Sequence, residues 1–233
     1  MSQFVFVPGL LCTGALFTQQ IAALEGRATC HIADTRGMDS ISAMAEKCLS
    51  DIDGEFALLG FSMGGYVAIE IARQAPERVR GLALVSTMAK PDTEEKRAQR
   101  QGLVELSQIG KFKGVTPRLL PRFFSKAALA DERKTQIAIQ MGEEVGKDNF
   151  ILQQSAIMTR QDGRPTLQNF AKSSIVICGT EDVLTPPEEA VEMADLLPNA
   201  SLHLLEGVGH MSTIEAPDLV TDLLTDWYDG LAD

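Results

Sequence analysis

The most restrictive feature of this sequence is a serine held among glycines at residues 60–65, which read Gly-Phe-Ser-Met-Gly-Gly. An apolar run at 56–59 precedes this motif, and a helix-like stretch at 66–73 follows it. A strand that reverses sharply into a helix strains the backbone of its central residue and leaves no room for side chains beside it. Gly60 and Gly64 meet that requirement. The pattern therefore predicts a strand, a tight turn that carries Ser62, and a helix.

Such a turn would make Ser62 a candidate nucleophile, because it holds the hydroxyl above the end of a sheet. The backbone N–H of Met63, at the start of the helix, would point to where an oxyanion forms on a substrate carbonyl. The alternative interpretation is an ordinary glycine-rich loop with a serine that caps the helix, since small residues cluster in many loops. The strand–turn–helix setting favours the nucleophile.

A serine nucleophile needs a histidine base, and the chain has three histidines. His31 and His203 lie in strand-like runs, where a structural role is the better interpretation. His210 lies in the glycine-rich run 206–212, ahead of the last helix-like stretch. A loop side chain can reach an active-site face without distorting a sheet, so we predict that His210 is the base. A loop histidine exposed by chance is the alternative.

The candidate for the acid that orients the histidine is Asp182. A β-branched run stops at Gly179, and Asp182 follows three residues later. Glu181 is the competing carboxylate, and a solvated loop charge is the alternative for either residue. The chain order Ser62, Asp182, His210 is the order expected when the three lie on loops at the carboxyl edge of one parallel sheet.

Together these motifs resemble the α/β-hydrolase fold superfamily, over most of the chain. The matching runs are Phe-Val-Phe-Val-Pro-Gly-Leu-Leu at 4–11, the serine turn at 60–65, Gly-Thr-Glu-Asp at 179–182 with Pro-Pro at 186–187, and Gly-His at 209–210. The resemblance implies a Ser–His–Asp triad at Ser62, His210 and Asp182. It also implies a second oxyanion-hole amide after the first strand. Many members carry His-Gly there and this chain carries Pro-Gly, which makes the Leu10 N–H the expected donor. The run 160–167 further resembles small bacterial esterase-like members.

Six short apolar runs alternate with helix-length stretches, which predicts a parallel sheet wrapped by helices. The expected strands are 4–7, 30–34, 56–59, 82–86, 175–178 and 202–205, and the expected helices outside residues 88–165 are about 15–24, 42–51, 65–74, 188–197 and 217–228. Residues 88–165 lack a convincing strand and are expected to be a helical cap. The fold class is therefore α/β: a mostly parallel, doubly wound sheet of residues 1–87 and 166–233 with an inserted cap, in one structural domain.

The expected cap differs in charge from the rest of the chain. Residues 88–165 hold 14 Lys and Arg against 10 Asp and Glu, a net charge of +4, whereas the remainder carries −15. A positive cap over an acidic core favours an anionic ligand. Arg160 and Arg164 are candidate ligands for a substrate carboxylate, and Phe123 and Met158 are candidates to line an acyl pocket. Solvated arginines and internal packing are the alternatives for these four residues.

Composition bears on which partners the protein binds and on where in the cell it is expected to act. The net charge of −11 disfavours a nucleic-acid partner. No apolar run approaches the ~20 residues of a membrane span, and the N-terminal stretch lacks a basic start, so we expect neither membrane anchoring nor export. The four cysteines form no Cys-x-x-Cys pair, which suits buried thiols in a reducing cytoplasm. No metal ligand set or cofactor motif is present, and the sequence does not indicate an oligomeric state.

The resulting hypothesis is a cytoplasmic serine hydrolase that transfers the acyl group of a small ester to water without a cofactor. Hydrolysis of a carbon–carbon bond in a diketone-like acid, opening of an enol-lactone and transfer to an acceptor other than water remain open, since one fold hosts many activities. A different class of function is a ligand sensor that keeps the triad and signals to a protein partner.

Overall fold

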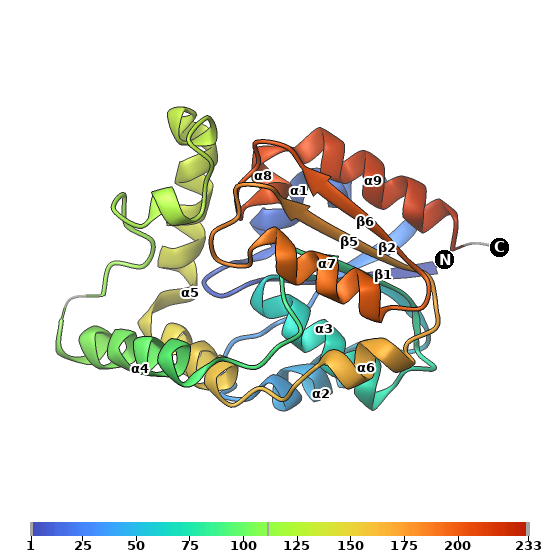
Figure 1. Ribbon diagram of the computed structural model, residues 1–233, viewed down its shortest axis with the longest axis horizontal. Helices are drawn as coiled ribbons and strands as arrows, with labels where there is room; N and C mark the ends of the chain where they lie inside the picture. The colour runs from blue at the N-terminus through green and yellow to red at the C-terminus, as the bar shows by residue number, and fades with distance from the viewer. Residues whose placement is uncertain (1, 111, 232–233) are drawn as a thin grey trace.

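The computed structural model describes residues 2–110 and 112–231, which form a six-stranded, all-parallel sheet covered by helices on both faces (Figure 1). The strand order is β2-β1-β3-β4-β5-β6. The strands are β1 (Ser2–Val7), β2 (Ala28–Ile32), β3 (Phe56–Phe61), β4 (Val79–Val85), β5 (Ser174–Gly179) and β6 (Ala200–Leu205). The six predicted strands and the doubly wound α/β fold are therefore confirmed, with strand ends that differ by a few residues.

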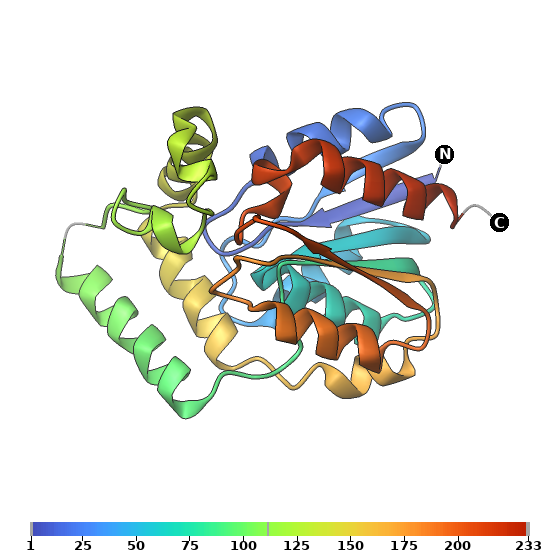
Figure 2. The same ribbon diagram turned by 45° about the horizontal axis from the view of Figure 1, so that its top comes forward.

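The helices divide into two layers. One face of the sheet packs against α2 (Ile41–Asp51), α3 (Met63–Gln74), α6 (Arg164–Asn169) and α7 (Pro187–Leu196). The other face packs against η1 (Gly14–Phe17), α1 (Thr18–Leu24), α8 (Ser212–Glu215) and α9 (Pro217–Asp229). Every residue of the central strand β3 is buried, as expected for a parallel strand with helices on both sides. Figure 2 shows the sheet between these two layers.

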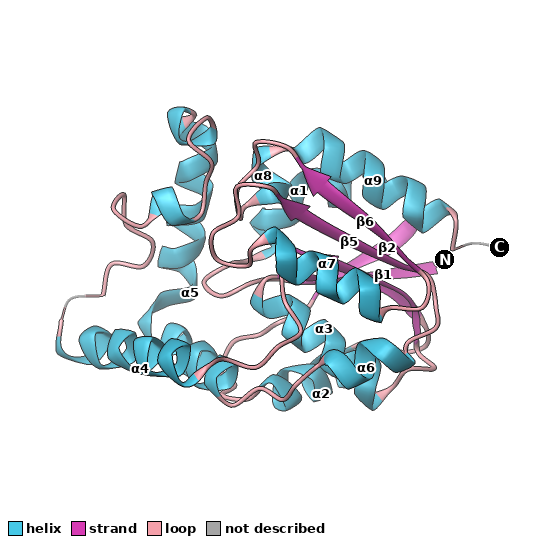
Figure 3. Ribbon diagram, in the orientation of Figure 1, coloured by secondary structure: helices cyan, strands magenta, loops and turns pink. Residues whose placement is uncertain are grey.

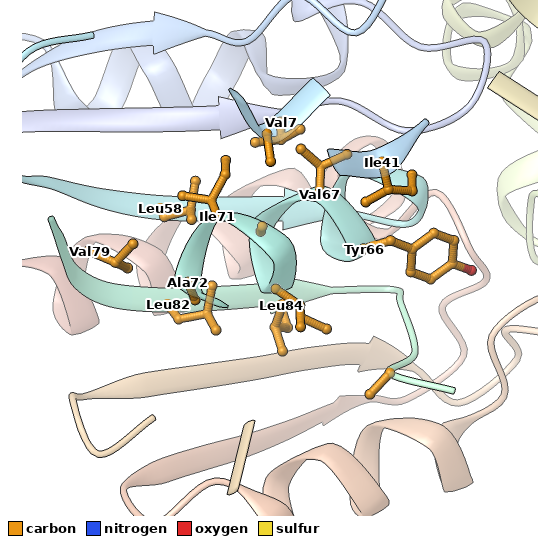
Figure 4. Close-up of a cluster of buried hydrophobic side chains, with 14 of the residues drawn as sticks. Val7, Ile41, Leu58, Tyr66, Val67, Ile71, Ala72, Val79, Leu82 and Leu84 are labelled. Atoms are coloured by element: carbon orange, nitrogen blue, oxygen red, sulfur yellow. The ribbon is translucent and has the colours of Figure 1, made fainter. Parts of the chain in front are cut away.

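Apolar packing fixes α3 against the centre of the sheet. In Figure 4, Val67 and Ile71 of α3 point toward the strand residues Val7 and Leu58, and these four residues are buried. Burying side chains of this size stabilises the fold by about 1.5–3 kcal/mol each. The beginning of α3, which carries the serine turn, is therefore held firmly against the ends of β1 and β3.

Between β4 and β5 the chain leaves the sheet. The described residues of the inserted segment, residues 88–165, form helices and loops without a strand, as Figure 3 shows. Its helices are α4 (Glu94–Ile109), η2 (Leu120–Arg122), η3 (Ala128–Ala130) and α5 (Glu132–Met158). The backbone at Gly146 leaves the helical conformation with φ 76°, so α5 consists of two helical stretches. The inserted segment lies beyond the carboxyl ends of the strands (Figure 1).

The order of strands determines where loops converge. The chain runs from β1 to the edge strand β2 and then returns to the other side of β1 to form β3. Such a reversal opens a crevice at the carboxyl ends of the two strands, where ligands bind in open α/β sheets. The loop after β1 and the turn after β3 both lie there.

Among the described residues, no helix is both long and apolar enough to span a bilayer.

Candidate active site

Ser62 stands in a strained turn between β3 and α3. Its backbone has φ 53° and ψ −117°, a left-handed region that a residue other than glycine rarely adopts. The flanking glycines are required for steric reasons: a Cβ on Gly64 would lie 2.0 Å from the carbonyl oxygen of Val7, and one on Gly60 would lie 2.4 Å from that of Gly64. The hydroxyl of Thr87, just after β4, donates to the Ser62 carbonyl at 2.7 Å and braces the turn.

His210 lies beside Ser62, in the loop between β6 and α8. Its Nε2 is 3.0 Å from the Ser62 Oγ, within hydrogen-bond distance. The imidazole is almost fully buried, and the ring of Phe61 lies 5.3 Å from it between centroids. The structure thus brings together a serine and a histidine that are separated by 148 residues. By contrast, His203 is hydrogen-bonded to Ser201 on β6, and His31 lies on β2.

Asp182 completes the chain of contacts. Its Oδ2 lies 2.8 Å from Nδ1 of His210, and the side chain is buried, whereas the competing Glu181 is exposed. Its Oδ1 accepts the backbone N–H groups of Leu184 at 2.8 Å and Thr185 at 3.0 Å. The Thr185 hydroxyl donates to Oδ2 at 2.7 Å. Every oxygen of the carboxylate is therefore engaged, and its orientation toward the imidazole is fixed.

The electrostatics favour an ionised Asp182. Burial by itself raises the pKa of this carboxyl, but the charge and hydrogen bond of His210 and the hydrogen bonds of Thr185 lower it by more. The net pKa lies below its ordinary value. An ionised acceptor at this position holds Nδ1 of His210 protonated and leaves Nε2 free to accept a proton from Ser62.

Two backbone amides are placed near Ser62. Met63 is the first residue of α3, where helix N–H groups have no intrahelical acceptor. Leu10 follows Gly9, whose missing Cβ would lie 3.3 Å from the Cβ of Ser62. Within residues 2–110 and 112–231, neither the Met63 N–H nor the Leu10 N–H has an acceptor in the protein. Both amides are thus available to an oxygen atom bound beside Ser62.

Arg160 is paired with other groups inside the protein. Its guanidinium is buried and forms an ion pair with Asp92 at 2.9 Å, with the two side chains 2% and 1% exposed. It also donates to the Lys90 carbonyl at 2.8 Å and lies over the ring of Tyr66, 4.3 Å from its centroid. Arg160 thereby ties the beginning of the inserted segment to its end. Arg160 thus has a buried carboxylate partner within the protein that the sequence did not reveal, and its role as a ligand for a substrate carboxylate stays a prediction.

The three other candidate substrate-binding residues are Arg164, Phe123 and Met158. Arg164 is on α6, which contacts α3 and α7 in the core layer, and it pairs with Asp162 at 2.5 Å. Phe123 lies near the histidine loop, since its carbonyl accepts the Met211 N–H at 3.0 Å. Met158 is the half-buried last residue of α5.

The structure also reveals supporting residues that sequence reasoning missed. Thr185 and Thr87 brace Asp182 and Ser62 as described above. Glu215 of α8 accepts the N–H of Gly209, next to His210, and that of Ser125 in the inserted segment. A further residue, Gln153 of α5, accepts the N–H of Leu11. The local sequence around these residues does not identify the distant groups to which they are hydrogen-bonded.

Two other kinds of chemistry, a reactive Cys12 thiol and a bound metal ion, have no support among the described residues. Burial raises the pKa of the Cys12 thiol to about 12, so that thiol stays protonated at neutral pH. Among the described residues, no group of three or more His, Cys, Asp or Glu side chains is arranged to hold a metal ion.

The sequence matches the alpha/beta hydrolase family over residues 4–223. The chain belongs to this family. A pimeloyl-[acyl-carrier protein] methyl ester esterase of Nitrosomonas europaea is 28% identical over 215 residues, which cover 85% of this chain and 84% of that relative. Relatives of this alpha/beta hydrolase therefore include an esterase, and this similarity supports hydrolysis as its class of reaction.

Solved structures show the same fold. A thermophilic esterase from Thermogutta terrifontis superimposes with a TM-score of 0.90 at 22% identity, over 99% of this chain and 90% of that one. The enol-lactonase from Burkholderia xenovorans LB400 superimposes with a TM-score of 0.86 at 21% identity, over 98% of this chain and 92% of that one. The similarity extends over almost the whole alpha/beta hydrolase chain.

Proposed function

We propose that this protein is a serine hydrolase that cleaves a carboxylic ester through an acyl-enzyme, with Ser62, His210 and Asp182 as catalytic residues. The observation that carries the proposal is the unbroken series of contacts from the Ser62 Oγ to His210 at 3.0 Å and from His210 to Asp182 at 2.8 Å. The strained backbone of Ser62 supports it, because strain of this kind clusters at functional sites.

The geometry accommodates each proton transfer. Nε2 of His210 takes the Ser62 proton as Oγ bonds to the carbonyl carbon, and the carbonyl oxygen becomes an oxyanion held by the N–H groups of Met63 and Leu10. The imidazolium, stabilised by ionised Asp182, gives its proton to the departing alcohol oxygen. Water then enters, loses a proton to His210 and attacks the acyl carbon. Collapse of the second tetrahedral intermediate releases the acid and returns the proton to Ser62.

The inserted segment, residues 88–165, is the proposed cap over this site. Its place beyond the carboxyl ends of the strands supports that role, because a cap there excludes water and limits which substrates enter (Figure 1). We propose a small-molecule ester as the substrate. The net charge of +4 on residues 88–165 favours an anionic ligand, whereas Arg160 and Arg164, the candidate ligands for a substrate carboxylate, are paired with Asp92 and Asp162.

The test is turnover of a panel of p-nitrophenyl esters and lactones by wild type, Ser62→Ala and Ser50→Ala. Ser50 is an exposed serine on α2 whose hydroxyl donates to the Lys47 carbonyl of the same helix, which makes it a matched control. We expect Ser62→Ala to lose about 10⁴-fold or more in kcat and Ser50→Ala to match wild type. Full activity in Ser62→Ala would rule out Ser62 as the nucleophile, and a preference for lactones would redirect the substrate assignment.

A further inference from the structure

Gln153 of α5 connects the inserted segment to the loop after β1. Its Oε1 accepts the backbone N–H of Leu11 at 3.1 Å, and its Nε2 donates to the Thr35 hydroxyl at 3.2 Å. The side chain has no exposed surface, and both ends of its amide are paired. A buried amide with both ends satisfied has one favoured orientation, because any other leaves polar groups without partners. Gln153 therefore presents a fixed acceptor to the loop.

The loop that it contacts has an unusual backbone. The Gly9 carbonyl accepts the Cys12 N–H at 3.1 Å, which closes a four-residue turn. Leu11, the third residue of that turn, has φ 58°, a position where glycine or asparagine is normally required. A leucine there is strained. The hydrogen bond from Leu11 to Gln153, together with that from Cys12 to Gly9, favours this arrangement of the peptide.

The turn also determines where the Leu10 N–H points. In a trans peptide the carbonyl and the N–H point in opposite directions. Because the Gly9 carbonyl is directed toward Cys12, the Leu10 N–H of the same peptide is directed away from the interior of the turn. Gly9 lies against Ser62, where its missing Cβ would be 3.3 Å from the serine Cβ. The conformation of this turn thus controls one of the two proposed oxyanion donors.

We propose that Gln153 is a positioning residue for catalysis: from the inserted segment, it holds the strained Leu11 peptide and so keeps the Leu10 N–H aligned with the oxyanion. The inference rests on the proposed function, since it assigns a role within that oxyanion hole. In this proposal α5 both covers the active site and helps to position one of its oxyanion donors. Thr13 strengthens the link, because its N–H contacts the sulfur of Met141 on the same helix at 3.4 Å.

The first experiment compares Gln153→Met with Gln154→Met. Methionine retains length and removes the acceptor. Gln154 is the matched control: it is a buried glutamine on the same helix whose Oε1 accepts from Arg100 instead of the loop. Loss of an oxyanion donor costs about 10²–10³ in kcat, so misalignment of one in Gln153→Met should lower kcat by roughly 10- to 100-fold. KM should stay within about twofold, because the lost interaction forms only in the transition state.

A rescue variant separates positioning from simple packing. Glycine adopts a positive φ without steric cost, so Leu11→Gly should hold the turn without help from Gln153. We expect Gln153→Met to lower kcat by less than about threefold in the Leu11→Gly background. A packing role for Gln153 would give the same loss in both backgrounds and would overturn the proposal. Equal kcat in wild type and Gln153→Met would overturn it as well.

Hydrogen exchange at the backbone amide of Leu11 tests the contact with Gln153 without measuring catalysis, so failure of the inference can be distinguished from failure of the proposed function. Exchange should be slow in wild type and in Gln154→Met and at least about tenfold faster in Gln153→Met. If Ser62→Ala retains activity, the proposed function fails and the catalytic role of Gln153 fails with it, whatever the exchange rates. If Ser62 is essential while exchange and kcat are unchanged in Gln153→Met, only the inference about Gln153 fails.

Discussion

Thr185→Val is the perturbation whose outcome follows most directly from the geometry. The Thr185 hydroxyl donates to Oδ2 of Asp182 at 2.7 Å, and both residues are buried. Valine keeps the shape of the side chain and removes the hydroxyl, which also lies 3.4 Å from Nδ1 of His210. A hydrogen bond to a charged group contributes about 1.5–3 kcal/mol, so the free energy of unfolding at pH 7 should fall by about that amount.

The loss should depend on pH, because the bond stabilises the ionised carboxylate. The pKa of Asp182 is lowered in the folded protein, so its ionised form contributes stability above the unfolded-state pKa of about 4. That contribution is lost as the pH falls through the folded-state pKa. Thr185→Val moves the folded-state pKa back toward the unfolded value. The stability difference between wild type and variant should therefore be largest near neutral pH and shrink as the pH falls below about 4.

The assay is urea denaturation at a series of pH values from 7 down to 3, with Thr185→Ser as the control. Serine retains the hydroxyl and loses a methyl group, so its stability difference should change little with pH. A stability loss for Thr185→Val that is the same at pH 7 and pH 3 would refute the reasoning, since it would assign the loss to packing.

Two other substitutions test the serine turn and the base of the inserted segment. Gly64→Ala should prevent correct folding or destabilise the protein by more than about 3 kcal/mol, because the new Cβ would lie 2.0 Å from the Val7 carbonyl oxygen. Gly102→Ala, on α4 with open space around it, should instead stabilise the protein by roughly 0.5–1 kcal/mol. Thermal unfolding measures both changes. Arg160→Met should lower the free energy of unfolding in urea denaturation by about 1.5–3 kcal/mol, because buried Asp92 loses the buried guanidinium of Arg160 and retains that of Arg100. The matched change Arg164→Met, at a partly exposed pair, should cost less than about 1 kcal/mol, and equal losses would contradict the assignment of Arg160 to the base of the segment.

The features that could be predicted from the sequence are those encoded locally. The turn at Ser62 needs its glycines within two residues, and each strand is a short apolar run, so the elements and their order follow from neighbouring residues. The proximity of Asp182 and His210 could be predicted because each lies on a loop that follows a strand, and these loops meet at one edge of the sheet. Their separation in sequence did not matter, since the parallel topology itself brings the strand ends together.

The features that could not be predicted depend on partners far away in the sequence. Arg160 pairs with Asp92, and Gln153 meets Leu11 across 142 residues. The sequence around each residue does not identify its distant partner. An arginine is identified as a substrate ligand or as part of a buried ion pair only when the opposing element is known, and helix-to-loop packing of this kind leaves no periodic signal.

Contacts at the loop after β1 and at the loop after β6 constrain how the inserted segment can move. Gln153 holds the loop after β1, and on the other side of the site the Phe123 carbonyl accepts the Met211 N–H at 3.0 Å. Glu215 adds a bridge, because its carboxylate accepts the N–H of Ser125 at 3.0 Å and that of Gly209, beside His210, at 3.1 Å. A rigid-body opening of the whole segment would break these bonds and displace Leu10 and His210 together. Substrate entry by local movement of α4, which lacks such bonds to either loop among the described residues, would leave the catalytic geometry intact.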